Sequence, residues 1–387
     1  MTLAIAVNCH PQPKQTPMTN HIKFLFNGNT VVVCKQRHPE IDPEVPSFSF
    51  QDFQLSLLEK LTSPFFKIRN LIKYHTLRPP TGRKRSEYRK FLVDNNITCV
   101  LTELGNDAFF FWPIAKELNI PVFAYFRGYD ATGYLEHSPR RFYKIAGYRT
   151  MCHHIDGLFA VSQFLIDELK KHDIKHPNSH VIPSGVDMAQ FGETQKDPNL
   201  TIAAGRFINK KSPETSIRAF LQASKTMPAS RLEMIGDGPL LNASKQLVQE
   251  LGAEDKIIFH GHQSHDFVLK KLQQASLFIQ HSVTASNNDK EGAPVVIQEA
   301  MSAGVAVVST HHAGIPQLVK DGVSGHLVDE FDEEKYSNCI KDLLLDSEKC
   351  RQFGRAGRSI AMKNFDRNNL YQKLEGVIRK QVNSRSL

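Results

Sequence analysis

The chain has 387 residues, 41% of them hydrophobic, and a net charge of +8. This length is too great for one typical hydrophobic core and suits two domains of ordinary size. Residues 1–7 lack the basic lead and the cleavage site of a signal peptide, and no apolar run is long enough to span a membrane. We therefore expect a cytoplasmic protein.

Six cysteines, at positions 9, 34, 99, 152, 339 and 350, are scattered without the spacing of metal ligands. This pattern favours reduced thiols in a cytosolic enzyme over a disulfide framework. Cys152 is followed by His153 and His154, but adjacent residues on a helix diverge too widely to hold one ion together. We expect no metal site.

Short runs rich in Val, Ile, Leu and Phe alternate with helical patterns along the whole chain, which is typical of parallel α/β layers. The expected strands are residues 3–8, 30–34, 97–101, 121–126, 157–161 and 179–182, then 200–204, 231–235, 257–260, 277–281, 305–309 and 326–328. The polar stretch 191–198 contains a proline and separates the two sets. The pattern predicts a domain at 1–192 and a second at 193–366.

The positive charge of the chain is concentrated in residues 67–90, which hold nine Lys or Arg and one acid, Glu87. Aromatic residues lie nearby, at Phe48, Phe50, Phe53, Phe65, Phe66 and Tyr74. A basic face with apolar neighbours suits an anionic membrane surface, at roughly 1 kcal/mol per well-placed cation. The alternative is a solvated loop over core aromatics. Nucleic acid is not an expected partner, because no recognition motif accompanies the patch.

The segment from Glu291 to Gly304 predicts a loop followed by a short helix. Gly292 can lie flat against a ligand, Pro294 suits the first helical position, and Gly304 is a typical left-handed residue after a helix. The free N–H groups at the helix start form an anion site, and Glu299 is a suitable acceptor for sugar hydroxyls. The alternative is an ordinary strand–helix connection with two surface carboxylates.

A second segment has matching chemistry. The expected strand 200–204 runs directly into Gly205, Arg206, Lys210 and Lys211, just before a helical pattern. Cations that follow a strand at the start of a helix can meet a diphosphate, Arg with a planar fork and Lys as a point charge. The alternative is a set of solvated loop charges.

Together the two segments resemble the retaining nucleotide-sugar glycosyltransferases of the GT-B fold, the family labelled glycosyl transferases group 1 (family four). Further matching segments are 161–164, 181–187, 235–239, 259–261 and 313–328. The resemblance implies two doubly wound, Rossmann-like domains facing across a cleft, with the acceptor on the first and the nucleotide sugar on the second. It also implies that a terminal helix, within 367–387, crosses back to the first domain.

By this resemblance, Arg206 and Lys211 bind the donor diphosphate, and Glu299 holds the ribose. Glu291 lies near the sugar, and backbone N–H groups of 292–295 cap the phosphates. The implied donor-site residues are Gly205, Arg206, Lys211, Gly236, His260, Gly261, Glu291, Gly292, Ala293, Pro294, Val295 and Glu299.

In the first domain the resemblance implies a catalytic role, beside that of Glu291, for Arg127 and Asp130, which follow the expected strand 121–126. Relatives often carry His-Gly-x-Asp here, and Arg127 stands at the His position, so the role of that His is in doubt. Asp130 is suited to accept an acceptor proton or to steady positive charge. The alternative is a structural Asp in a strand-end turn. The family's Gly-Gly pair is also missing from the loop 8–17.

The expected reaction is transfer of a sugar from UDP- or GDP-sugar, with retention, to a saccharide or lipid-linked acceptor in polysaccharide or glycolipid biosynthesis. No metal or other cofactor is expected, because Arg206, Lys211 and the helix N-terminus can stabilise the leaving diphosphate and no paired-Asp motif is present. A peripheral location at the inner face of the membrane would suit the segment 67–90. Two alternatives remain: a nucleotide-sugar epimerase, and a non-catalytic GT-B binding protein.

Overall fold

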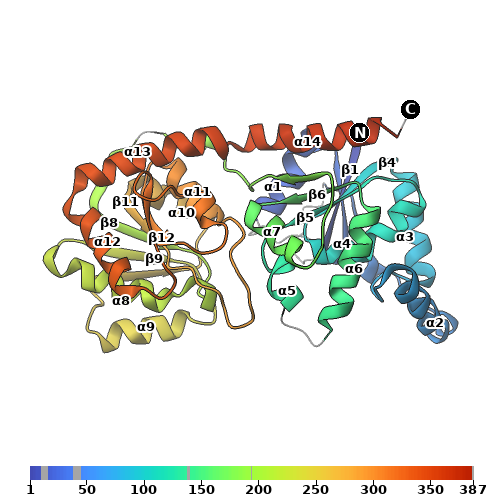
Figure 1. Ribbon diagram of the computed structural model, residues 1–387, viewed down its shortest axis with the longest axis horizontal. Helices are drawn as coiled ribbons and strands as arrows, with labels where there is room; N and C mark the ends of the chain where they lie inside the picture. Colours follow the sequence, from blue (N-terminus) through green and yellow to red (C-terminus); the bar gives the residue numbers. More distant parts are fainter. Residues whose placement is uncertain (10–15, 38–44, 137–139, 193, 386–387) are drawn as a thin grey trace. The chain divides into compact units, whose positions relative to one another are not determined.

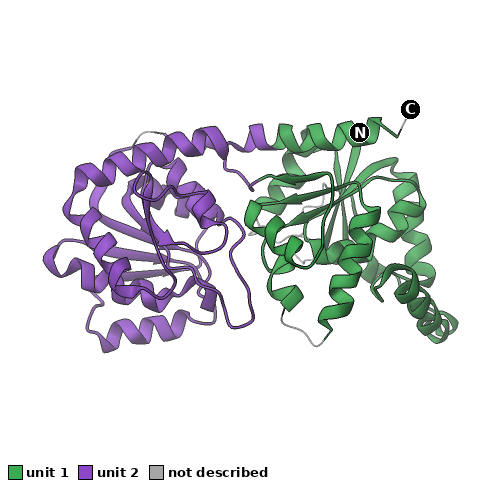
Figure 2. Cartoon of the chain, in the orientation of Figure 1, with its two compact units in different colours: residues 1–182, 371–387 green, residues 183–370 purple. Residues whose placement is uncertain are grey.

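A computed structural model describes residues 1–9, 16–37, 45–136, 140–192 and 194–385. The chain forms two compact units, one of Met1–Ile182 with Tyr371–Leu387 and one of Pro183–Leu370 (Figure 2). The boundary between the units lies after Ile182, whereas the sequence predicted it after residue 192. The reason is that the segment after Ile182 bonds within unit 2: Gly185 N donates to Gln298 Oε1 at 3.2 Å, and Val186 bridges to Asp366.

Unit 1 is built on a seven-stranded parallel sheet in the order β3-β2-β1-β4-β5-β6-β7. Its strands are β1 (Thr2–Cys9), β2 (Thr30–Gln36), β3 (Ser47–Ser49), β4 (Ile97–Thr102), β5 (Val122–Phe126), β6 (Gly157–Ala160) and β7 (Ser179–Val181). Its helices are α1 (Thr16–Phe24), α2 (Leu57–Tyr74), α3 (Gly82–Asp94), α4 (Gly105–Glu117), α5 (Gly133–Glu136), α6 (Arg141–His154) and α7 (Gln163–Lys171).

Unit 2 holds a six-stranded parallel sheet in the order β10-β9-β8-β11-β12-β13. Its strands are β8 (Asp197–Ala204), β9 (Arg231–Ile235), β10 (Ile257–Gly261), β11 (Ala275–Ile279), β12 (Ala306–Thr310) and β13 (Gly325–Val328). Its helices are α8 (Pro213–Ala223), α9 (Leu241–Glu250), α10 (His265–Gln274), α11 (Val295–Ser302), α12 (Glu333–Leu345) and α13 (Ser347–Asn364) (Figure 1).

The last helix, α14 (Arg367–Asn383), begins in unit 2, and its residues from Tyr371 onward belong to unit 1. Within unit 1, Glu375 Oε1 accepts a hydrogen bond of 2.7 Å from Phe26 N, and the ring of Tyr371 lies edge-on to His21. In the described ranges, no helix is both long enough and apolar enough to cross a bilayer.

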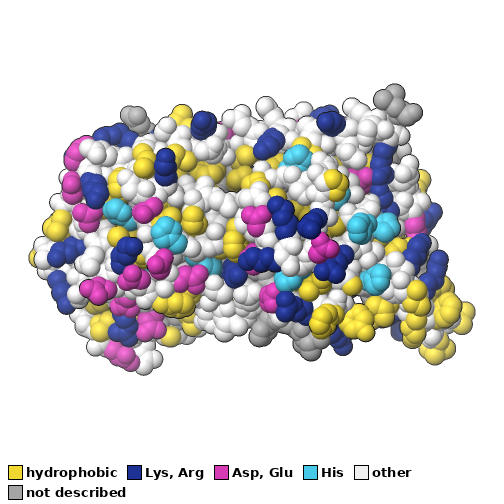
Figure 3. Space-filling view, viewed as in Figure 1, with side chains coloured by type: hydrophobic (Ala, Val, Ile, Leu, Met, Phe, Trp, Pro, Cys, Tyr) yellow, Lys and Arg dark blue, Asp and Glu magenta, His cyan; other side chains and the backbone are white. Residues whose placement is uncertain are grey.

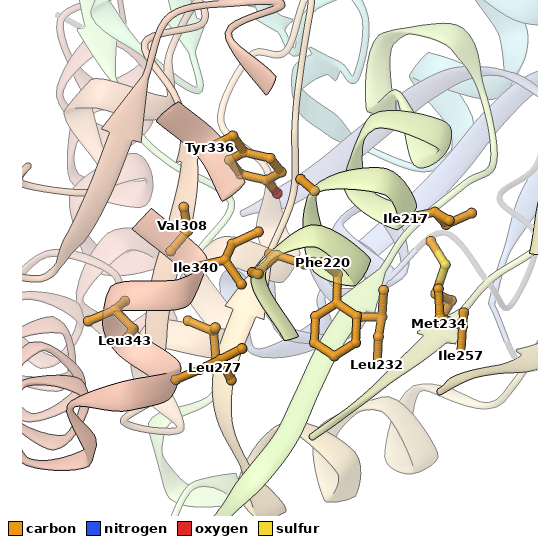
Figure 4. Packing of buried hydrophobic residues seen from close by; sticks show 14 of the residues in the cluster. Ile217, Phe220, Leu232, Met234, Ile257, Leu277, Val308, Tyr336, Ile340 and Leu343 are labelled. Carbon is orange, nitrogen blue, oxygen red and sulfur yellow. The ribbon is translucent and has the colours of Figure 1, made fainter. Parts of the chain in front are cut away.

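The core of unit 2 shows why these residues form these layers. Phe220 of α8 packs against Leu232 of β9, while Tyr336 and Ile340 of α12 lie over Val308 (Figure 4). All five are buried. Apolar residues at helical spacing on α8 and α12 therefore cover the continuous apolar strands of the parallel sheet, at about 25 cal/mol per Å² of apolar surface removed from water.

All twelve predicted strands are present, with ends shifted by up to three residues. The strand β3 was not predicted, because its three residues, Ser-Phe-Ser, lack an apolar run. In each sheet the first strand in the chain, β1 or β8, is an inner strand, and later strands lie on both sides of it. In such doubly wound sheets ligands bind at the carboxyl ends of the strands where the order reverses. In unit 2 this point lies between β8 and β11.

Candidate functional site

The ends of β8 and β11 bring together the residues that the sequence placed far apart. The strand β8 leads into Gly205 and Arg206, and β11 leads into Gln280. Lys211 closes a short 3₁₀ turn, Asn209–Lys211, that connects this loop to α8. Gly205, Arg206, Lys211 and Gln280 line one hollow at this point of the sheet.

Lys211 is the centre of the cluster. Its Nζ lies 2.9 Å from Gln280 Oε1 and 2.9 Å from Glu291 Oε1. Burial lowers the pKa of Lys211, the charge of Glu291 opposes this shift, and the neighbouring Lys210 and Arg206 add to it. Arg206 itself is exposed. The cluster therefore presents the exposed Arg206, the mostly buried Lys211 and the buried Lys210 beside the buried carboxylate of Glu291.

Glu291 is held in its ionised form. Burial would raise its pKa, but the charges of Lys211 and Lys210 hold the pKa at about 2. Its backbone N–H donates to His312 Nε2 at 3.1 Å, so the proton of a neutral His312 lies on Nδ1, which donates to Glu330 Oε1 at 2.6 Å. The loop that carries Glu291 is thus anchored by a histidine that the sequence reasoning did not identify.

The loop 291–295 is almost completely buried and leads into α11. Pro294 was expected at the first helical position, but it is the N-cap, with φ −56° and ψ 121°, and Val295 begins the helix. The extended ψ of Pro294 keeps Gly292 and Ala293 outside the helix as a connecting loop. Gly304 has a φ of +71° and follows the helix, as predicted.

Glu299 lies inside α11, and its Oε1 is 2.8 Å from His265 Nε2. The hydrogen bond that this carboxylate accepts from the imidazole raises the pKa of His265. His265 was not identified from the sequence, because nothing in its spacing connects it to Glu299. Gln298, also missed, donates from Nε2 to Ala293 O at 3.3 Å and so fixes the loop before the helix.

Two predicted donor residues lie at the end of β10. His260 Nε2 is 2.7 Å from Glu233 Oε2, a carboxylate that Lys271 Nζ also approaches at 2.6 Å. The carbonyl of Gly261 accepts a hydrogen bond of 2.8 Å from Gly236 N. The structure thus connects Gly261 to the loop that follows β9, and the ring of His260 is held by Glu233 of β9.

In unit 1, the guanidinium of Arg127 turns back to the buried Glu103, with which it makes an ion pair. His21 Nδ1 lies 2.6 Å from the other oxygen of the same carboxylate. Burial raises the pKa of Glu103, but the charges of His21 and Arg127 outweigh it and hold the pKa at about 2. Glu103 follows β4, beside the reversal of strand order in this sheet, and was not identified from the sequence.

Asp130 is buried, and its carboxylate accepts three backbone N–H groups: Gly105 at 2.8 Å, Gly128 at 2.9 Å and Arg127 at 3.0 Å. Burial raises the pKa of Asp130, and the three amides oppose the shift. This geometry is that of the structural Asp in a strand-end turn, the alternative that the sequence left open. The neighbouring loop after β1, which contains His10 and Lys14, lies in part outside the described residues.

Comparison with known proteins decides the family. A model described as glycosyl transferases group 1 matches residues 187–360, and one described as glycosyltransferase family 4 matches residues 28–190. The chain belongs to the group 1 glycosyltransferases.

Curated relatives of this group 1 family member match over part of their length. WcaL of Salmonella typhimurium, named for colanic acid biosynthesis, is 33% identical over 183 residues, which are 46% of this chain and 45% of WcaL. The GDP-mannose-dependent alpha-(1-6)-phosphatidylinositol monomannoside mannosyltransferase of Mycolicibacterium smegmatis is 26% identical over 197 residues, 48% of this chain and 52% of that protein. The chain thus spans about half the length of the curated relatives that it matches.

Solved structures match almost the whole chain. Anabaena Alr3699/HepE, solved in complex with UDP, is 16% identical with a TM-score of 0.76, over 98% of this chain and 100% of that one. The sucrose-phosphate synthase of Thermosynechococcus elongatus is also 16% identical, with a TM-score of 0.74 over 99% and 100% of the two chains. The predicted fold, two doubly wound domains of the GT-B class, is confirmed.

Across the described parts of the chain, no three His, Cys, Asp or Glu side chains are grouped as ligands of one ion.

The loop after β8 in this glycosyltransferase family member depends on a glycine packed against it. Gly236 has a φ of +143°, and a Cβ there would lie 1.9 Å from Gly205 O. We expect Gly236→Ala to destabilise unit 2 by about 3 kcal/mol or more and to weaken nucleotide binding. Gly252→Ala is the control: its φ is +58° in open space, so only the backbone strain of about 1–2 kcal/mol applies. Urea unfolding followed by circular dichroism compares the two; equal losses would contradict the prediction.

Asp130 gives a test of its structural role. We expect Asp130→Asn to destabilise unit 1 by about 1–3 kcal/mol, because an amide cannot accept all three backbone N–H groups. The single Trp of the chain, Trp112 of α4, lies in unit 1, so its fluorescence reports the unfolding of that unit. Asp167→Asn, on the exposed side of α7, should leave this transition unchanged. An unchanged transition for Asp130→Asn would show that the three bonds contribute nothing.

Proposed function

We propose that the chain transfers a sugar from a nucleotide-diphosphate donor to a saccharide or lipid-linked acceptor in polysaccharide or glycolipid biosynthesis. The observation that carries the proposal is the cluster at the β8–β11 reversal, where Lys211 bridges Gln280 and Glu291 beside the exposed Arg206. A diphosphate entering here meets two cations and the amide end of α11, which is a favourable anion environment. Glu291 is then the carboxylate nearest to the sugar.

The names of the relatives support a nucleotide-sugar donor. The Mycolicibacterium protein is named as GDP-mannose-dependent, and Anabaena HepE was solved with UDP. Which nucleotide this chain prefers is tested directly by thermal stabilisation with UDP and with GDP. We expect one of them to stabilise unit 2 and Arg206→Ala to reduce the effect, because this exposed side chain can be removed without disturbing the core. Stabilisation by neither nucleotide would contradict the proposal.

We propose further that transfer proceeds with retention and without a metal ion. Lys211, Arg206 and the N–H groups of α11 supply the charge stabilisation that a metal ion provides elsewhere. Asp130 is saturated by backbone donors, so we assign the acceptor proton to a phosphate oxygen of the donor and give Asp130 and Arg127 positioning roles. NMR of the product tests the anomeric configuration, and loss of turnover on chelation with recovery by manganese would refute metal independence.

Two other functions are separated by simple assays. Incubation with nucleotide sugar alone would yield a new epimer if the chain were an epimerase, whereas a transferase requires an acceptor. A non-catalytic binding protein would be stabilised by the nucleotide but would release none of it from the nucleotide sugar. A screen of UDP- and GDP-sugars with membrane extract as acceptor, measuring nucleotide release, distinguishes all three.

We propose that unit 1 associates with an anionic membrane surface through residues 67–90. In this segment Arg85 and Arg89 pair with Glu117, and Arg83 pairs with Glu87, so part of the charge is neutralised. The cations of α2 remain exposed beside exposed Phe65 and Phe66. Hydrophobic side chains gather on the surface over α2 (Figure 3). Flotation with anionic vesicles at low salt tests the association. Absence of binding under these conditions would contradict it.

A further inference from the structure

Helix α2 exposes an unusual amount of apolar surface. Six of its side chains are each more than half exposed: Leu57, Leu58, Leu61, Phe65, Ile68 and Ile72. At 3.6 residues per turn, these positions fall within an arc of about 100° on one side of the helix. Ser63, Asn70 and Tyr74 point the opposite way and are buried. We call the six exposed side chains the apolar arc of α2.

The helix is firmly attached by its buried side. Ser63 Oγ bonds with Thr81 Oγ1 at 3.2 Å, Asn70 Nδ2 donates to Pro79 O at 3.3 Å, and Tyr74 Oη donates to Glu117 Oε1 at 2.9 Å. A capping box of Ser56 and Glu59 fixes its start. The apolar arc is thus presented to solvent by a rigid helix rather than by a loose segment.

Cations border the apolar arc on both sides. By the same helical geometry, Arg69 and Lys73 lie along one edge, and Lys60 and Lys67 lie beyond the other. All four are exposed. An apolar stripe with cations on both flanks is the pattern of a helix that lies in the plane of a membrane interface.

A cavity of about 520 Å³ adjoins this surface. Leu71 and His75, at the end of α2 next to the apolar arc, form one wall, and Phe109 of α4 and Tyr143 of α6 add apolar surface. Lys144, also of α6, contributes charge. The cavity therefore continues the apolar arc into unit 1.

Three cations line the cavity: Arg78, Arg140 and Lys144. Lys144 Nζ donates to Tyr134 O at 2.8 Å, and the Arg78 guanidinium donates to Asn106 O. Burial lowers the pKa of Lys144, and the charge of Arg78 lowers it further. The buried carboxylate nearby, Asp107, forms its ion pair with Lys35 at 3.6 Å, and the charge of Arg78 also acts on it. Arg78 and Lys144, which repel each other and bond to neutral carbonyl oxygens, are suited to share an anion.

We propose that this cavity binds the phosphate of an anionic membrane phospholipid, whose acyl chains lie beside the apolar arc of α2. The proposal rests on the membrane association proposed above and deepens it, since it names the lipid group that unit 1 recognises. Charge complementarity supports a lipid rather than a protein partner. The cations lie inside the cavity and along the edges of the apolar arc, and a bilayer likewise places its phosphates next to its acyl chains. The binding is noncovalent.

The test is flotation of the full chain with vesicles of phosphatidylcholine containing increasing phosphatidylglycerol, at physiological salt. Lys144→Gln removes a cavity cation that lies outside residues 67–90. Lys90→Gln removes the same charge from α3, away from the cavity. We expect Lys144→Gln to raise the lipid concentration for half binding about tenfold, and Lys90→Gln to raise it less than about fivefold. Leu61→Ser with Phe65→Ser should abolish binding at this salt.

A second measurement uses the unaltered protein and so does not depend on whether the variants fold. Photoactivatable phosphatidylglycerol should label residues 71–78 and 140–144, and soluble glycerol 3-phosphate should not prevent labelling. Equal shifts for Lys144→Gln and Lys90→Gln, labelling elsewhere, or full competition by glycerol 3-phosphate would overturn the cavity assignment and leave membrane association standing. If the unaltered protein does not float with vesicles of any of these compositions, the cavity assignment and the proposed membrane association both fail. Nucleotide stabilisation should be unchanged in every variant, which separates this site from the donor site.

Discussion

Replacing Lys211 with methionine is expected to lower kcat/KM for sugar transfer by at least about 10²- to 10³-fold. The Lys211 side chain is 15% exposed, its ammonium lies 2.9 Å from Glu291, and it is the fixed cation of the cluster at the β8–β11 reversal. A preorganised donor to developing charge has an effect of this size in a water-excluded site. Steady-state nucleotide release, with titration of UDP or GDP to separate binding from turnover, measures the loss.

The same change should destabilise unit 2 by about 3–5 kcal/mol, because the Glu291 carboxylate would remain buried without its partner. Glu291→Gln together with Lys211→Met removes both charges and should recover much of this stability while activity stays lost. Such recovery separates the ion pair's structural effect from its contact with the donor. If the double variant regained both stability and turnover, the diphosphate would have to be held elsewhere.

The strand order explains which parts of this site the sequence could predict. Lys211 and Glu291 each follow a recognisable strand and belong to segments with turn and helix signals, so their side chains could be named in advance. Gln280, His312 and His265 could not, because their roles depend on which strand ends become neighbours. The residue Gln280 simply follows β11, and only the placement of β11 beside β8 brings it to Lys211.

The aromatic residues near the basic segment show a different limit. Phe48 and Phe50 are buried in the core of unit 1, while Phe65 is largely exposed on α2. Composition cannot distinguish these cases, since all three are apolar residues within a short stretch. The helical period of α2 does distinguish the exposed side from the buried side. The positions opposite the apolar arc, such as Ser63 and Asn70, are polar and form hydrogen bonds with Thr81 and Pro79.

Arg127 shows how a departure from a family motif can be compensated in the fold. The resemblance left its role in doubt because relatives carry His at this position. The structure gives it a partner, Glu103, which also binds His21. An Arg side chain that is only 13% exposed is compatible with this place because a buried carboxylate faces it. Glu103 was not identified from the sequence because it is a single carboxylate at the end of β4 that belongs to no recognisable motif.

Glu103→Gln is expected to be the most destabilising single change in unit 1, at about 3–5 kcal/mol, because it leaves the mostly buried Arg127 without a counter-charge. Urea unfolding followed by Trp112 fluorescence measures it. The difference should depend on pH. The folded-state pKa of Glu103 is lowered to about 2, so its contribution, about 3 kcal/mol, is complete above pH 4.5 and is lost as the pH falls toward 2.

The control is Glu136→Gln, whose carboxylate in α5 pairs with Arg141 and His172 and is about one-third exposed. It should shift the transition by less than about 1 kcal/mol at any pH. The difference in unfolding free energy between the Glu103 variant and the unaltered protein should become smaller between pH 5 and pH 2. The reason is that protonation removes the charge of the native carboxyl, as the substitution does at every pH. A gap that stays constant down to pH 2 would mean that the Glu103 charge is not what stabilises the cluster, and that the side chain acts through packing alone.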